Sequence, residues 1–332
     1  MRAFVLCAGL GTRLRPITGC VPKALMPYLN VALLDRRLRA LAAEGLQEAA
    51  VNLHHEGGRI VEHVGEAPVP GVAVRFFWEP EILGTGGALK NAESFFESGD
   101  VLVWNVDAEL VPDLPRLSAA HQVFGGELTL LAARNPDPTR FTPLGVEGGR
   151  LVSVGEPVAD PWLFTGVSIV SDAAVARLPP GASSVVEALW RPVLAAGRPI
   201  AVVPHEGAFF DLGTPADLLE ASLLALEMRQ DFQPSEGVFD FERKILSAQP
   251  LEAALEVSWS VMGRVRVGAA RVSRSVLLDG ADVAAAREIS GCIVGPGAIP
   301  EGSVFHDSLL WPGESGLRAL PIHGRHWRSP AV

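Results

Sequence analysis

Glycines and cations lie close together near the start of the chain. A short apolar run at residues 4–8 leads into Gly9 and Gly11, and Arg13 and Lys23 follow soon after. Glycine lets backbone N–H groups approach a polyphosphate closely. The planar guanidinium of Arg13 suits bidentate contact with phosphate oxygens, and Lys23 adds a point charge. These residues predict a phosphate-binding loop at the end of a strand.

The loop differs from two common phosphate-binding motifs. It lacks the Gly-Lys-Ser/Thr of a Walker A loop, and Leu14 stands where the dinucleotide fingerprint has its third glycine. On the two glycines alone, a tight turn between a strand and a helix with surface cations is the better interpretation. Further motifs are therefore needed to assign the chemistry.

The elements that position this loop alternate between strand and helix. Leu34, Leu38 and Leu41 fall at helical spacing, and Gly45 stands where a helix C-cap glycine belongs. Near-continuous apolar runs predict strands buried on both faces of a sheet, and they occupy residues 4–8, 49–53, 72–77 and 101–105. This alternation predicts an α/β fold with a doubly wound, mostly parallel sheet, whose ligands bind beyond the carboxyl ends of the strands.

The C-terminal part of the chain has a different periodicity. Aliphatic residues recur about every five or six positions, with glycines and small residues between them, as in the hexapeptide pattern of a parallel β-helix. An ordinary β-rich tail is the alternative. The rhythm is carried by Val267, Val272, Val283, Ile289, Ile293, Ile299 and Val304. We expect a first domain at residues 1–230, a linker at 231–255, and a short β-helix with a tail at 256–332.

Composition limits the partners. The 332 residues carry a formal net charge of −10, which argues against long nucleic acid as a ligand, and 48% of them are hydrophobic, which supports a sizeable core. We expect no membrane span and no signal peptide, because no apolar run is long enough. Cys7, Cys20 and Cys292 lack the spacing of metal ligands. A cytoplasmic protein is the simplest interpretation.

Four segments, taken in order, resemble the signature of the sugar-1-phosphate nucleotidylyltransferases. They are GLGTRLRPIT with PKALMP (residues 9–27), EPEILGTGGALKNAE (79–93), VWNVDAEL (103–110) and FFDLGTP (209–215). The resemblance covers nearly the whole chain, because a short left-handed parallel β-helix often follows the catalytic domain in this family. It implies the Rossmann-like fold of the nucleotide-diphospho-sugar transferases, with residues 1–230 as the catalytic domain.

The resemblance also implies a reaction. An oxygen of a sugar 1-phosphate attacks the α-phosphorus of a nucleoside triphosphate, pyrophosphate leaves, and an NDP-sugar forms. The nucleophile is already an anion, so positioning and charge neutralisation carry the catalysis. The implied catalytic residues are Arg13, Lys23, Asp107 and Asp211, and the two aspartates would hold Mg²⁺. The implied nucleotide contacts are Leu6, Ala8, Gly9, Gly11, Thr12, Glu79, Gly86 and Gly87.

The sugar side departs from the family pattern. Many relatives have Glu-Lys-Pro where this chain has Gly155-Glu156-Pro157, and Asn-x-Gly where it has Phe164-Thr165-Gly166. The lysine that contacts the sugar phosphate is therefore missing from this position. The expected sugar contacts are Gly145, Glu156, Thr165 and Gly166, and the identity of the sugar stays open.

The base is constrained only slightly better. Residues 83–93 resemble guanylyltransferases that act on mannose or heptose phosphates, whereas GTGG and residues 51–64 are similar to N-acetylmuramate-1-phosphate uridylyltransferases. Glu79 or Glu81 near the base could accept from guanine N1–H and N2–H₂, a pairing that uracil cannot match in full. This favours GTP over UTP.

Two other classes of function remain open. One is a regulatory paralogue that binds NDP-sugar without turnover and uses the β-helix as an assembly surface, including assembly into a homo-oligomer. The missing sugar-side lysine motivates it. The other is acyl transfer by the β-helix with His306 as the base, although such enzymes usually need more coils.

Overall fold

The computed structural model describes the chain except residues 97–98, 125, 229–235, 253, 314–315 and 323–332. The chain forms two compact units that are discontinuous in sequence. Residues 1–10 and 34–211 form one, which we call the sheet unit, and residues 11–33 and 212–332 form the other, which we call the coil unit. The expected boundaries at residues 230 and 255 stay a prediction, and the compact units follow different limits.

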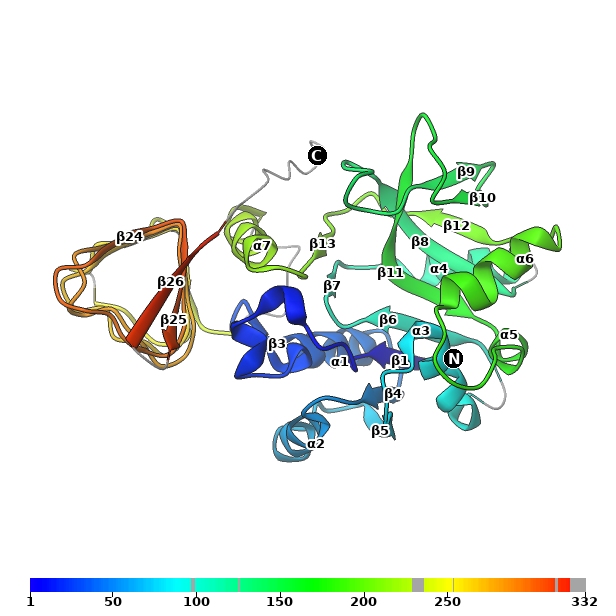
Figure 1. Ribbon diagram of the computed structural model, residues 1–332, viewed down its shortest axis with the longest axis horizontal. Helices are drawn as coiled ribbons and strands as arrows, with labels where there is room; N and C mark the ends of the chain where they lie inside the picture. The colour runs from blue at the N-terminus through cyan, green and yellow to red at the C-terminus, as the bar shows by residue number, and fades with distance from the viewer. Residues whose placement is uncertain (97–98, 125, 229–235, 253, 314–315, 323–332) are drawn as a thin grey trace. The chain divides into compact units, whose positions relative to one another are not determined.

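The sheet unit is built on a nine-stranded sheet with the order β5-β4-β1-β6-β11-β8-β12-β10-β9 (Figure 1). Its first four strands pair in parallel and match the four apolar runs of the sequence. They are β1 (Arg2–Leu6), β4 (Glu48–Leu53), β5 (Ala73–Trp78) and β6 (Val101–Asn105). The strand β5 lies at the edge, so its residues alternate between exposed and half-buried instead of being buried on both faces.

The rest of the sheet is mixed. The strand β11 (Trp162–Val170) runs antiparallel to both β6 and β8 (Leu128–Arg134), and β12 (Ala201–Pro204) runs parallel to β8. A hairpin of β9 (Leu144–Glu147) and β10 (Arg150–Val154) follows β8 in the chain. The α/β class is as predicted, but the sheet is less parallel than expected, because β11 reverses direction after this hairpin.

Helices accompany the strands. They are α1 (Leu33–Ala43), α2 (Gly57–Glu66), α3 (Gly84–Asn91), α4 (Leu114–Val123), α5 (Asp172–Ala176), α6 (Arg191–Ala195) and, in the coil unit, α7 (Pro215–Met228). Leu34, Leu38 and Leu41 of α1 are fully buried, and Gly45 adopts the left-handed conformation of a C-cap glycine, as predicted. No helix in the described part of the chain is long and apolar enough to cross a bilayer.

The described residues between 238 and 321 form a stack of short coils, which we call the coil stack and which has a triangular outline in Figure 1. Most of its strands pair in parallel with a strand one coil later, 15 to 17 residues on, as Ile245 does with Ser260 and Val272 with Ile289. The strands are β14 (Val238–Asp240), β15 (Ile245–Ser247), β16 (Val257–Ser258), β17 (Ser260–Met262), β18 (Arg271–Ser273), β19 (Val276–Leu277), β20 (Ala281–Asp282), β21 (Glu288–Ser290), β22 (Ile293–Val294), β23 (Gly297–Ala298), β24 (Val304–His306), β25 (Ser308–Gly313) and β26 (Gly316–Pro321).

The interior of the coil stack is aliphatic. Six of the seven residues that carry the sequence rhythm are buried, whereas Val304 is 46% exposed, so that assignment was wrong. The register explains the error. Phe305 lies opposite the buried Ile289 and packs against the core of the stack, so Val304 points outward opposite Glu288.

Cys292 lies in the same buried core. Burial raises the pKa of its thiol to about 11, so this thiol is protonated at neutral pH.

A buried charge cluster joins α1 to a two-residue strand, β7 (Ala108–Glu109). Arg36 and Arg37 both pair with the carboxylate of Glu109, and Arg37 also donates to the carbonyl oxygen of Ala108. The guanidinium of Arg37 lies 4.7 Å from the ring centroid of Trp104. Burial alone would raise the pKa of Glu109, but the charges and hydrogen bonds of the two arginines outweigh it and lower that pKa.

Glu109→Gln should lower the free energy of unfolding by about 3–5 kcal/mol, because it leaves buried guanidinium groups without their carboxylate. The pKa of Glu109 is lowered in the folded state. Its stabilisation is therefore complete above the ordinary carboxyl pKa of about 4.3 and is lost as the pH falls through the lowered folded value. Urea unfolding at several pH values measures both effects.

Glu48→Gln is the matched control, since Glu48 pairs with Arg2 where both side chains are more than one-third exposed. Its cost should stay below about 1 kcal/mol. Equal losses in the two variants would contradict a structural role for the buried cluster.

Candidate active site

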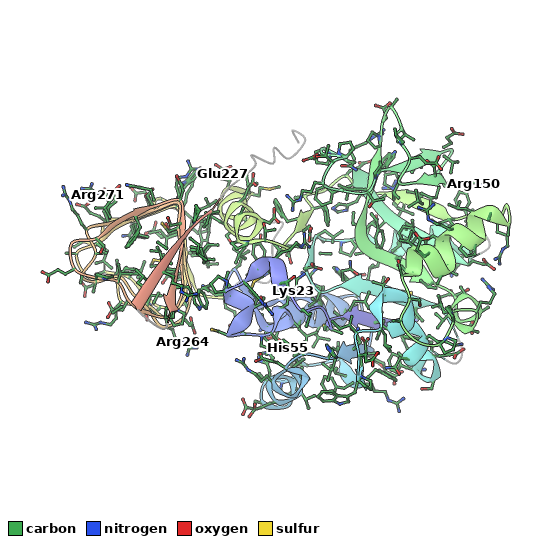
Figure 2. The ribbon with its side chains drawn as sticks, in the orientation of Figure 1. Lys23, His55, Arg150, Glu227, Arg264 and Arg271 are labelled. Carbon is green, nitrogen blue, oxygen red and sulfur yellow. The ribbon has the colours of Figure 1, made fainter. Side chains whose placement is uncertain are left out.

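The loop of residues 11–27, which we call the cation loop, is shaped by its own side chains. Gly11 has φ 60°, and a Cβ there would lie 2.8 Å from Cγ2 of Thr18 and 3.2 Å from Cβ of Lys23. The hydroxyl of Thr18 donates to the carbonyl oxygen of Gly11 at 2.7 Å. Lys23 begins a short 3₁₀ turn and is labelled in Figure 2. Only glycine fits at position 11, for reasons internal to the loop.

Gly9 presents the opposite case. It is exposed just beyond β1, and a Cβ there would meet no atom of the described chain within 4 Å. Its φ is not in the left-handed region. The packing and conformation of the described chain therefore do not require glycine at position 9. Close approach of a ligand to the backbone does provide a reason for it.

The remaining nucleotide candidates at this strand end have ordinary surroundings. The carbonyl oxygen of Leu6 accepts from the backbone N–H of Val106 at 3.2 Å, and Ala8 is buried. Thr12 is exposed at the start of a 3₁₀ turn. They stay predictions as nucleotide contacts.

Arg13 lies against the backbone before α7. A Cβ on Gly213 would be 2.6 Å from Nη2 of Arg13, so a larger residue there would displace this guanidinium. The next residue, Thr214, caps α7 by accepting from the backbone N–H of Asp217 at 3.2 Å, and Pro215 opens the helix. The DLGTP segment (residues 211–215) therefore both begins α7 and contacts the guanidinium of Arg13.

The two predicted metal ligands are brought together by strand pairing. The short strand β13 (Phe210–Asp211) pairs antiparallel with β7, so that Asp211 lies opposite Ala108 and next to the position of Asp107. Both carboxylates are half-buried. No group of three or more His, Cys, Asp or Glu side chains that could hold a metal occurs among the described residues. Mg²⁺ needs only one or two carboxylates when substrate phosphates complete its shell, so this donor set fits it.

Gly166 allows β11 to approach the turn that carries Asp107. It has φ 84°, and a Cβ there would be 3.0 Å from both Cβ of Ala108 and Nδ2 of Asn105. The hydroxyl of Thr165 is buried and donates to the carbonyl oxygen of Leu131 at 2.8 Å, and its expected contact with the sugar stays a prediction. Of this pair, Gly166 therefore borders the turn that carries Asp107, while the hydroxyl of Thr165 bonds within the sheet.

Arg140 lies beside Asp211, although sequence reasoning did not select it. Its Nη2 is 3.8 Å from Oδ2 of Asp211, and its guanidinium lies 4.7 Å from the ring centroid of Phe141. The loop that carries it is held by Asn135, which donates to the carbonyl oxygen of Phe141 at 3.0 Å, and by Asp137, which accepts from the backbone N–H of Thr139. The Asn-Pro-Asp-Pro spacing is a signal for such an ordered turn.

The segment expected near the base is organised by Glu79. Its buried carboxylate accepts from Nδ2 of Asn52 at 2.7 Å and from the backbone N–H of Leu83 at 2.9 Å, while Oδ1 of Asn52 accepts from the backbone N–H of Cys7. Glu79 therefore ties the ends of β1 and β4 to the segment that enters α3. Glu81 in the same segment is exposed.

Gly86 and Gly87 approach another part of the chain rather than open space. Both backbone N–H groups donate to the carbonyl oxygen of Ser183, at 2.9 and 3.3 Å. A Cβ on Gly86 would lie 2.7 Å from Oγ of Ser183, and one on Gly87 would collide with the carbonyl of Gly181. The two glycines thus let α3 pack on residues 181–184, and their contact with the base stays a prediction.

The hairpin of β9 and β10 carries the other expected sugar contacts. Gly145 lies beside Ser153, whose hydroxyl occupies the space that a Cβ would need. Glu156 is exposed at the end of the hairpin. Packing against Ser153 thus favours glycine at position 145, and Glu156 is accessible to a ligand.

Comparison with known proteins decides the family. A family model described as "Nucleotidyl transferase" matches residues 2–153. The N-acetylmuramate alpha-1-phosphate uridylyltransferase of Caulobacter vibrioides is 32% identical over 232 residues, which cover 66% of this chain and 94% of that protein. The chain belongs to the sugar-1-phosphate nucleotidylyltransferase family. It is an enzyme of the guanylyl- or uridylyltransferase type that forms NDP-sugars.

Other relatives and solved structures are also similar to this chain. Mannose-1-phosphate guanylyltransferase of Mycobacterium tuberculosis is 27% identical, and the match covers 88% of this chain and 82% of that protein. The crystal structure of HddC from Yersinia pseudotuberculosis, complexed with GMP-PN, has a TM-score of 0.58 at 25% identity, covering 67% of this chain and 97% of that one. A putative glucose-1-phosphate thymidylyltransferase from Bacillus anthracis, with a TM-score of 0.61 at 21% identity, covers 68% and 95% of the two chains and shows the fold alone.

The two signature glycines should respond differently to substitution. Gly9→Ala should leave the free energy of unfolding unchanged or raise it by up to about 1 kcal/mol, because no described atom opposes the methyl group. It should weaken nucleoside triphosphate binding at least about tenfold, because the methyl group occupies space that a ligand needs. Gly11→Ala should cost about 1–2 kcal/mol from its left-handed backbone, with a further loss from the clash with Thr18. Thermal unfolding and calorimetric titration measure the two effects. Greater instability in Gly9→Ala than in Gly11→Ala would contradict this account.

Proposed function

We propose that this enzyme transfers a guanylyl group from GTP to a sugar 1-phosphate, with Mg²⁺ held by Asp107 and Asp211. The observation that carries the proposal is the pairing of β7 with β13, which puts Asp211 opposite Ala108. Asp107 lies in the turn directly before β7, so this pairing puts both carboxylates where they could serve one ion. A bound Mg²⁺ would take carboxylate and phosphate oxygens as ligands and neutralise phosphate charge during the transfer.

The chain's own residues supply the remaining positive charge. Gly9, Gly11 and the neighbouring backbone of residues 6–12 would bind the triphosphate through N–H groups. Arg13 would hold the β- and γ-phosphates and stabilise the departing pyrophosphate, and Lys23 would contact the α-phosphate. The attacking oxygen belongs to a phosphate that is already ionised, so no residue has to act as a strong general base.

Guanine is proposed as the base for two reasons. Mannose-1-phosphate guanylyltransferases from several organisms match this chain, and that of Mycobacterium tuberculosis matches 88% of it at 27% identity, whereas the uridylyltransferase of Caulobacter vibrioides matches 66% at 32% identity. In addition, Glu81 is an exposed carboxylate in the base segment and could accept from guanine N1–H and N2–H₂. Glu79 would act by holding this segment, since both of its carboxylate oxygens already accept hydrogen bonds.

Arg140 is proposed as the cation that binds the phosphate of the sugar substrate. It stands next to a proposed metal ligand and is carried by an ordered loop. A guanidinium there would compensate for the lysine that the Gly155-Glu156-Pro157 segment lacks. Gly145, Glu156 and Gly166 are proposed to border the sugar.

The coil stack is proposed to be a left-handed parallel β-helix. The regular parallel pairing over 15 to 17 residues and the aliphatic interior support it. The hand of the coils in a crystal structure would test this assignment, and right-handed coils would overturn it.

Pyrophosphate release tests the proposed function directly. The purified chain with Mg²⁺ should release pyrophosphate fastest with GTP when each of the four common nucleoside triphosphates is paired with a panel of sugar 1-phosphates. A mannose- or heptose-type phosphate should be the best acceptor. Turnover with UTP alone would overturn the choice of base, and background rates with every pair would count against the enzyme.

Arg140→Ala should reduce kcat/KM for the sugar 1-phosphate by about 10²–10³, because it removes a preorganised charge from the transferring phosphates. The KM for GTP should change much less. Initial rates with each substrate varied in turn measure both constants.

Arg150→Ala is the matched control, since the guanidinium of Arg150 on β10 also lies over an aromatic ring, 5.5 Å from the centroid of Phe124 at the end of α4. Arg150 is labelled in Figure 2. This variant should keep wild-type kinetics. Similar losses in both variants would show that Arg140 acts only through the stability of the fold.

A further inference from the structure

A tight hairpin follows the cation loop. Its strands β2 (Pro27–Tyr28) and β3 (Val31–Ala32) pair antiparallel, and Leu29 and Asn30 form the two-residue turn with φ 50° and 63°. Turns of this kind favour Asn and Gly, and a leucine at positive φ is strained. Contacts elsewhere must therefore stabilise this turn.

Those contacts come from the coil stack and the segment before it. Nδ2 of Asn30 donates to the carbonyl oxygens of Glu236 at 3.0 Å and Met262 at 3.1 Å. The backbone N–H of Glu236 donates back to the carbonyl oxygen of Leu29 at 3.2 Å. Met262 is fully buried at the end of β17, inside the stack. The tip of the hairpin is thus bonded to the first coils of the stack.

A second connection runs through α7. The hydroxyl of Tyr28 donates to the carbonyl oxygen of Ala221 in α7 at 3.1 Å, and Tyr28 is buried. The helix α7 in turn contacts β17 of the stack. Immediately before α7, Gly213 forms the seat of Arg13. All of these residues belong to the coil unit, together with Lys23.

We infer that the coil stack positions the cations of the loop. The stack holds Asn30, which fixes the hairpin that follows Lys23, and it contacts α7, whose start receives Arg13. The stack would therefore act in catalysis without touching a substrate. This inference rests on the proposed function, because it takes the loop to bind the triphosphate. By linkage, nucleotide binding and the stability of the stack should strengthen each other.

Asn30→Asp tests the inference in the full chain. Aspartate keeps the size and the tolerance for positive φ but removes both N–H donors and sets an anionic oxygen against two carbonyl groups. Hydrogen exchange of residues 22–32 without nucleotide should rise about tenfold, as expected for the loss of such bonds. The KM for GTP should rise as well. Asn30→Gly, which keeps the turn and removes the donors without adding charge, should act in the same direction.

Gln249→Glu is the matched control. Nε2 of Gln249 donates to the carbonyl oxygen of Val265 at 2.7 Å, so this variant loses the same kind of bond within the stack, to a carbonyl group that Asn30 does not contact. It should leave exchange of residues 22–32 and the KM for GTP unchanged. Equal effects of Gln249→Glu and Asn30→Asp would overturn the inference, because they would reflect general loss of stability.

Unchanged exchange of residues 22–32 in both Asn30 variants would also overturn it. So would faster exchange without any change in nucleotide affinity, since the stack would then hold only the hairpin. The exchange measurement needs no turnover. If the wild-type chain proves inactive with every nucleotide, the proposed function fails while the link between stack and loop is still read from the exchange rates.

Discussion

The candidate site depends on one short piece of backbone pairing, between the two-residue strands β7 and β13. It joins Ala108 to Asp211 across a long stretch of sequence and so brings two carboxylates to neighbouring positions. Such a short ladder has little stability of its own. Two further hydrogen bonds stabilise it, because Arg37 and the indole N–H of Trp104 both donate to the carbonyl oxygen of Ala108. The buried pairing of Glu109 with α1 secures the next residue.

The glycines of the family signature stand at positions with different physical constraints. Gly11, Gly166 and Gly213 each make room for another part of the chain: a side chain of the same loop, the turn before β7, and the guanidinium of Arg13. Gly9 meets no such neighbour among the described residues. A single motif therefore contains glycines that the packing of the chain requires and one, Gly9, that it does not, and this difference is visible only in the structure.

Much of the fold could be predicted from sequence because its signals are local. The apolar runs predicted the strands β1, β4, β5 and β6. The leucine spacing predicted the helix α1, and Gly45 predicted its C-cap. The direction of β11 could not be predicted, because it depends on how the hairpin before it packs. The outward position of Val304 was missed because a shift of one residue in a short coil exchanges the inner and outer faces.

The candidate site was predictable only where the family motif reaches. Asp107, Asp211, Arg13 and Lys23 lie in motifs whose order along the chain identifies them. Arg140 and Asn30 lie outside those motifs, and their partners are distant in sequence, so no local pattern marks them. Glu79 and Gly86 lie within a motif, but their close neighbours are Asn52 and Ser183, which the motif does not contain.

Manganese binding tests the central claim most directly, because it reports the paired carboxylates without requiring turnover. Electron paramagnetic resonance titration of Mn²⁺, in the presence of a non-hydrolysable GTP analogue, should give one site per chain in the wild type. Asp107→Asn and Asp211→Asn should each weaken the affinity for Mn²⁺ at least about tenfold. The double variant should bind Mn²⁺ only slightly more weakly than the weaker-binding single variant, because both carboxylates act on one ion. Losses that multiply in the double variant, or full affinity in either single variant, would contradict a metal site built by the pairing of β7 with β13.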